Sequence, residues 1–295
     1  MRPLAGVLTA LALLLPVQAL AWGQKGHSIV NQVAIDLAAS KLPPFMSTAR
    51  EHIIFNSYEP DRWRTEGRSP MNVAQELDHE INLERWGAIS TLPADRYSFL
   101  RQLMEWRIDL RIGYLPYAIV ENYGRLVNAF RYWRNAKDPK DREFSRDNAV
   151  YVAGILGHYV GDGAQPLHVT IHFNGWADGV PNPKNFTTDR HFHSRYESLY
   201  VNSAVEVTRV RAKARGIEQL SNPWDSIKQY LNQSFSEIEP VYEIEKTGQF
   251  NPEKPSTKGT DFIAAELARA GTMLADLWYT AWVESAEPVR TPNAN

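Results

Sequence analysis

The sequence predicts an all-α protein with one compact multi-helix domain and long loops. Six segments carry apolar residues at intervals of three and four, the spacing of one helix face. Alternating apolar and polar runs, which are typical of strands, are scarce, and no unit of about 20–50 residues repeats. Hydrophobic residues make up 43% of the chain and charged residues 22%, which is the composition of a globular protein.

The predicted helices follow from apolar periodicity and from the residues that bound them. Pro43 and Pro44 end the first helix, and Asp95 precedes the second. The fourth is almost wholly apolar, which predicts a buried central helix. Long loops are expected at 173–189 and 248–260. In chain order, the helices are expected at 26–39, 97–106, 117–133, 148–160, 226–238 and 262–282.

The N-terminus has the pattern of a secretory signal peptide. Arg2 precedes an apolar run at 4–15, and Ala19-Leu20-Ala21 forms a small-residue cleavage site. The run is shorter than the roughly 18 residues of a membrane span, and no later run reaches that length. We therefore expect a signal peptide at 1–21, an exported domain at 22–283 that is periplasmic or secreted, and a flexible tail at 284–295. An uncleaved membrane anchor is the alternative.

Charge and cysteine content narrow the function classes. The chain has 32 Lys+Arg and 34 Asp+Glu, a net charge of −2, which argues against nonspecific binding of nucleic acid through excess basic charge. It has no cysteine, so disulfides and thiolate ligands are excluded. A bound metal must therefore use histidine, carboxylate or backbone groups. No heptad or apolar stripe indicates a stable protein partner.

The histidines form patterns that predict metal binding. His158 and Asp162 are four residues apart and share one face of a helix, and the pair His193 and Glu197 repeats that spacing. His168 follows a helix break at Pro166. Either pair alone is commonly a surface or salt-bridge pair. However, burying His158 and Asp162 unpartnered would be costly, and a metal would satisfy both. Imidazole and carboxylate ligands suit zinc.

Together these motifs resemble the trinuclear-zinc superfamily, which comprises bacterial zinc-dependent phospholipase C and the single-strand nucleases (nuclease/3′-nucleotidases) of fungi and plants. The resemblance covers the whole mature chain. The motifs that carry it are Trp22 after the cleavage site, Gly26-His27, His158-Tyr-x-Gly-Asp162-x-x-Gln-Pro-x-His168 and His193-Ser-x-Tyr-Glu197.

The resemblance implies three zinc ions. Trp22, through its α-amino nitrogen and carbonyl oxygen, and His27 would hold the first. Asp61 would bridge this first ion and a second ion. The second ion would also be bound by His79, His158 and Asp162. The third would be held by His168, His193 and Glu197. Asp78, beside His79, is the alternative carboxylate.

The resemblance also implies a reaction, in which a zinc-activated water attacks a phosphodiester and Asp61 orients that water or accepts its proton. The substrate is expected to be a phospholipid or a single-stranded nucleic acid or nucleotide. Glu197, where nucleases usually carry Asp, favours phospholipase C. Lys25 argues against a choline headgroup, and Glu80 replaces an aromatic that would stack on a base. Another phosphoester and a non-catalytic zinc- or phosphoester-binding protein are the remaining alternatives.

Overall fold

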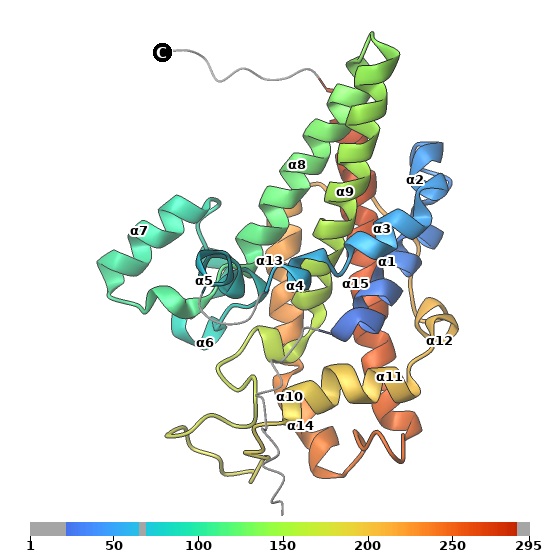
Figure 1. Cartoon of the computed structure of the whole chain (residues 1–295). Coiled ribbons are helices and arrows are strands. Elements are labelled where there is room, and N and C mark those ends of the chain that lie inside the picture. The colour runs from blue at the N-terminus through green and yellow to red at the C-terminus, as the bar shows by residue number, and fades with distance from the viewer. Residues whose placement is uncertain (1–21, 65–68, 288–295) are drawn as a thin grey trace, which may run out of the picture.

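The computed structural model describes residues 22–64 and 69–287, and this part of the chain is all-α (Figure 1). Its β pairing consists of two isolated bridges, Ile81 with Gly113 and Phe173 with Gly175. The predicted fold class is confirmed. No helix in the described ranges has the length and apolar character of a membrane span. The expected signal peptide at 1–21 and the end of the expected tail, 288–295, lie outside the described residues.

The elements follow one another without a repeat. In chain order they are α1 (Gly23–Ala38), α2 (Pro44–Thr48), α3 (Arg50–Asn56), α4 (Glu59–Arg62), α5 (Pro70–Gln75), η1 (Glu76–His79), α6 (Leu83–Trp86), η2 (Ile89–Thr91), α7 (Arg96–Trp106), η3 (Leu110–Ile112), α8 (Leu115–Asn135), α9 (Pro139–Ala164), η4 (Pro166–His168), α10 (Phe192–Ser194), the π-helix η5 (Arg195–Tyr200), α11 (Val201–Ala204), α12 (Val207–Arg211), α13 (Pro223–Ser236), α14 (Ile238–Lys246) and α15 (Thr257–Glu284).

The core lies where α8 and α9 form a long hairpin and α15 packs against both (Figure 1). Helix α1 packs along α15 and also contacts α9. Glycines at 154, 157 and 161 allow close approach on one side of α9. A Cβ at Gly157 would lie 2.3 Å from the amide oxygen of Asn31, and one at Gly161 would lie 2.8 Å from Nδ1 of His27. The close contact therefore brings α1 and its histidine against α9.

The central helix is longer than its apolar stretch predicted. Helix α9 begins at Pro139, after Asp138, whose side chain accepts a hydrogen bond from the backbone N–H of Lys140. The turns before Asn148 are largely exposed, so apolar periodicity could not mark them. Similarly, α15 begins at Thr257, inside the expected loop, because Ser256 caps its first turn. The sequence prediction also lacked α14.

Backbone pairing fixes the segment after η1 against the segment after α9. The N–H of Ile81 donates to the carbonyl of His168, and the N–H of Leu83 donates to that of Val169. On the other side of this segment, the N–H of Asn82 donates to the carbonyl of Ile112. Because these bonds are main-chain, the positions of His79 and His168 are set together.

The close approach of α9 to α3 gives a matched test of this packing. A Cβ at Gly154 would lie 2.7 Å from the carbonyl oxygen of Ile53, whereas one at Gly124 of α8 would meet no described atom within 4 Å. We expect Gly154→Ala to lower the free energy of unfolding by about 1–3 kcal/mol through overpacking. Gly124→Ala should raise it by about 0.5–1 kcal/mol. Urea denaturation measures both, and equal effects would contradict the packing.

Candidate metal centre

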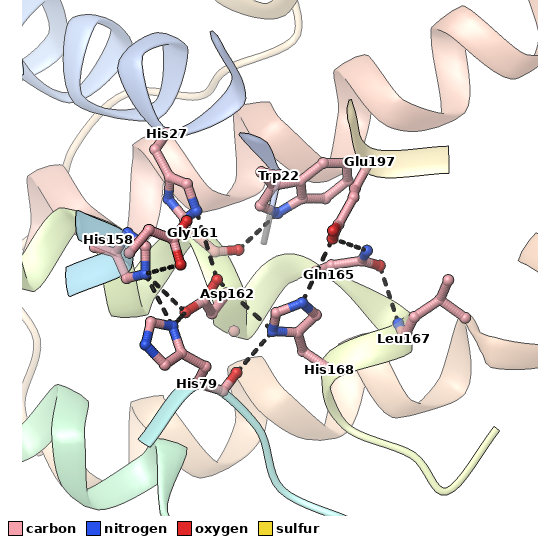
Figure 2. Close-up of polar contacts among 12 residues, drawn as sticks. Trp22, His27, His79, His158, Gly161, Asp162, Gln165, Leu167, His168 and Glu197 are labelled. Atoms are coloured by element: carbon pink, nitrogen blue, oxygen red, sulfur yellow. Dashed lines mark hydrogen bonds and ion pairs between the residues drawn. The ribbon is translucent and has the colours of Figure 1, made fainter. Parts of the chain in front are cut away.

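Histidine and carboxylate side chains from seven elements meet in one buried centre beside the last turns of α9 (Figure 2). Each is at most 6% exposed. They are His27 of α1, Asp61 of α4, His79 of η1, His158 and Asp162 of α9, His168 of η4, His193 of α10 and Glu197 of η5. Within each of three sets the ligand atoms lie within 4.8 Å of one another, so each set could hold a metal ion. The sets are His27, His158 and Asp162; Asp61, His79 and His158; and His168, His193 and Glu197, so the first two share His158.

The set His168, His193 and Glu197 has the clearest geometry. The two Nε2 atoms are 3.1 Å apart. An oxygen of Glu197 lies 2.7 Å from Nε2 of His193 and 3.5 Å from that of His168. Ligand atoms on a tetrahedral zinc lie about 3.3 Å apart, given bonds of about 2.0–2.1 Å. The spacing therefore fits a zinc ion between the three side chains.

Hydrogen bonds on the outer sides of the His168 and His193 rings determine which nitrogen of each ring has a lone pair available for a metal ion. Nδ1 of His168 faces the carbonyl of His79 at 2.7 Å, and Nδ1 of His193 faces that of Phe173 at 3.0 Å. Carbonyls only accept, so each Nδ1 carries a proton and a neutral ring presents the Nε2 lone pair inward. Two lone pairs and a carboxylate then face one another, which requires a positive charge between them, either an added proton or a metal ion.

The set Asp61, His79 and His158 is buried as well. His158 donates from Nδ1 to the carbonyl of Ser57 at 2.9 Å, so its Nε2 faces inward. There Nε2 lies 3.0 Å from Nδ1 of His79 and 3.9 Å from an oxygen of Asp61. Burial lowers the pKa of His79 and His158 well below the usual value, which keeps both rings neutral and able to act as ligands.

Asp162 connects this set to His27. Its Oδ2 lies 3.0 Å from Nδ1 of His79, and its Oδ1 lies 3.6 Å from Nε2 of His27. Asp162 thus faces both His79 and His27, while Asp61 lies on the His158 side. The expected bridging role of Asp61 between two ions stays a prediction. His158 has one inward nitrogen and can serve one ion, although its ring stacks on that of His27 at 4.0 Å.

Trp22 lies beside this part of the centre. It is buried, and its indole N–H donates to the carbonyl of Gly161 at 2.7 Å, next to Asp162 (Figure 2). Coordination through its α-amino nitrogen and carbonyl oxygen stays a prediction.

The charges of the centre show that these residues suit a cation. Burial raises the pKa of Asp162 well above its usual value and that of Asp61 to about 7, with Arg64 opposing the shift at Asp61. Burial also acts to raise the pKa of Glu197, but His193 and His168 outweigh it and lower the pKa to about 2. Within the described residues, one oxygen each of Asp61, Asp162 and Glu197 has no hydrogen-bond partner. Such atoms are costly to bury unless they bind a cation.

Gln165 is a site residue to which the sequence analysis gave no role. Its Oε1 accepts from the backbone N–H of Leu167, which orients the amide, and its Nε2 donates to Glu197 at 3.1 Å (Figure 2). Its place in the Gln-Pro motif was the available signal. By contrast, Asp78, the alternative ligand, is bound by Arg96 at 2.6 Å and belongs to none of the three sets.

The remaining histidines also lie apart from the three sets. His52 and His191 are exposed. His172 is buried, but its ring stacks on Trp176 at 3.7 Å and its Nδ1 accepts from the backbone N–H of Ala177. His172 is therefore a packed loop residue close in sequence to a candidate ligand.

A cavity of about 250 Å³ adjoins the centre. Three candidate ligands, His79, His168 and His193, form part of its wall, so the centre is open on this side. The other lining residues are Arg64, Asn72, Glu76, Glu80 and Phe173.

Comparison with known proteins adds no assignment, since neither a protein-family model nor a curated protein matches the chain.

His168 and His172 are both buried and lie four residues apart, so replacing each of them distinguishes a ligand from a packed residue. We expect His168→Ala to lose one zinc equivalent, because it removes one of three inward donors. His172→Ala should keep the wild-type zinc content even if it costs some stability. Plasma emission spectroscopy on zinc-loaded, desalted protein measures the ratio. Equal zinc content in the two folded variants would contradict the ligand role of His168. The charge between His168, His193 and Glu197 would then be balanced by a proton on a histidine and not by a metal ion.

Proposed function

We propose that this protein is an exported zinc-dependent phosphodiester hydrolase of the trinuclear-zinc superfamily, leaning to the phospholipase C type. The observation that carries the proposal is that three adjoining ligand sets share one buried centre, and that His79, His168 and His193 also line a cavity. Structural zinc sites are typically closed by four protein ligands, whereas catalytic sites keep an open position.

Zinc bound at these side chains would lower the pKa of a water molecule and neutralise charge on a phosphate. Asp61 is placed to take up a proton, because one of its oxygens has no hydrogen-bond partner among the described residues. Arg64 pairs with the other oxygen at 3.5 Å and lines the cavity, where its guanidinium suits a phosphate oxygen. In the net reaction a P–O bond to the water oxygen forms, and the P–O bond to the leaving alcohol breaks and that alcohol gains the proton.

The charge around the cavity supports the phospholipid substrate. Two carboxylates line it, Glu76 and Glu80, and Arg111 pairs with Glu76 at 2.8 Å. Glu80 would attract a cationic headgroup and repel the next phosphate of a nucleic acid strand. Lys25, which seemed to oppose a choline headgroup, is not a lining residue and pairs with Glu206.

One observation favours the nuclease alternative. Phe173 lines the cavity and is 43% exposed, so its ring offers a face on which a base could stack. The two substrate classes therefore need a direct comparison on one preparation.

The test uses zinc-loaded protein that begins at Trp22, assayed on phosphatidylcholine/phosphatidylethanolamine vesicles and on single-stranded DNA and RNA. We expect release of phosphorylated headgroup, and mononucleotides would instead establish the nuclease. Loss of an outer hydrogen-bond partner of a metal ligand costs about 10–100-fold in activity. Asp162 is itself a candidate ligand, so Asp162→Asn should reduce turnover by more than about 100-fold. Asp78→Asn is the matched control and should retain activity.

Two results would contradict the proposal. A zinc-replete, active Asp162→Asn protein would remove the centre from the reaction. Zinc binding with no turnover on any of the three substrates would favour the non-catalytic alternative or another phosphoester.

A further inference from the structure

The carbonyls at the end of α9 are satisfied by groups from three other parts of the chain. The last four carbonyls of a helix have no partner inside it. That of Gly161 accepts from the Trp22 indole, and that of Asp162 accepts from the backbone N–H of Gln165. The carbonyls of the next two residues, 163 and 164, accept from Ser234 of α13 and Arg269 of α15. Three of the last four carbonyls of α9 are thus held by distant parts of the chain, and that of Asp162 is held by the residue that caps the helix.

Arg269 is the centre of the network on the α13–α15 side. Its Nη2 donates to the carbonyl of Ala164 at 3.1 Å and to the hydroxyl of Ser234 at 2.9 Å. Its Nη1 donates to the carbonyl of Tyr230, also at 3.1 Å, and the Tyr230 hydroxyl donates to the carbonyl of Val160. One guanidinium therefore holds α9 directly and also binds two residues, Tyr230 and Ser234, whose side chains hold it.

The charge of Arg269 is compensated on both sides. The side chain is 14% exposed and pairs with Glu266, which is 8% exposed. A cation at the C-terminus of a helix also interacts favourably with the partial negative charge of the carbonyls there. Lysine could supply the charge but not the fixed fork of donors.

The position of this contact along the chain links it to the metal centre. Ala164 comes two residues after Asp162 and four before His168, which belong to different ligand sets. Gln165, between them, donates to Glu197. A shift of the chain at Ala164 would therefore change the separation of the sets.

We propose that Arg269 is a positioning residue for the metal centre, which holds the end of α9 so that Asp162 and His168 lie at the correct separation for their ions. Arg269 belongs to none of the ligand sets and acts through the carbonyl of Ala164. The proposal rests on the proposed zinc-dependent function, and the experiment separates the two.

The variant is Arg269→Met with Glu266→Gln, which removes both members of the buried pair and leaves no uncompensated charge. The matched control is Arg215→Met with Asp276→Asn. That pair also joins an arginine to a carboxylate of α15, at 2.7 Å, and among the described residues neither side chain hydrogen-bonds to α9. Ser234→Ala, which removes one bond to α9 and one to Arg269, is the milder variant if the double variant does not fold.

Two measurements are made on each folded protein. In protein freed of metal by a chelator, the amides at 164, 165 and 167–169 should exchange hydrogen faster in the Arg269 variant than in the wild type, but not in the control. Competition with a chelator should show zinc affinity reduced about 10–100-fold at the affected sites, the range for loss of an outer partner of a metal ligand. Ser234→Ala should shift both readouts in the same direction by less.

The positioning role would be overturned if the Arg269 variant exchanged its amides at 164, 165 and 167–169 as slowly as the wild type. It would also be overturned if the zinc affinity of that variant lay within about 3-fold of the control. Absence of zinc from the wild-type protein would overturn the proposed function, and with it the link to metal, while hydrogen exchange would still show whether Arg269 holds this turn.

Discussion

The structure depends on one electrostatic constraint, the burial of three carboxylates together. Asp61, Asp162 and Glu197 are each at most 4% exposed and lie among imidazole rings, of which burial keeps those of His79 and His158 neutral. Buried anions are tolerated only when paired or bound to a cation. Arg64 serves Asp61, but the remaining negative charge requires protons or metal ions at the centre. Metal binding is the explanation that also accounts for the inward orientation of the histidine nitrogens.

The fold meets this constraint by making α9 a shared support. Its apolar turns are buried between α8, α15 and α1, and its small residues allow α1 to approach with His27. The main-chain bonds between 81–83 and 168–169 bring His79 alongside His168. The π-helix η5 carries Glu197, and such irregular turns are frequent at functional sites. Helix packing and ligand placement therefore depend on the same contacts.

The local part of the centre could be predicted from the sequence, because four-residue spacing on a helix puts two side chains on one face. This holds for His158 with Asp162 and for His193 with Glu197. Asp61 and His79 have no such spacing, and their inclusion came from a family resemblance. The position of Asp162 between His79 and His27 could not be predicted, because it depends on which oxygen faces which histidine in space. The contact of Arg269 with α9 could not be predicted either, since Arg269 is 105 residues from Ala164 and no sequence pattern around it indicates a contact.

The central claim is that metal ions, and not protons, balance this buried charge. Anomalous X-ray diffraction at the zinc edge, on crystals of zinc-loaded protein beginning at Trp22, tests it most directly. We predict three peaks, with one about 2.0–2.1 Å from Nε2 of both His168 and His193. A map with no peak between His168, His193 and Glu197 would contradict the account.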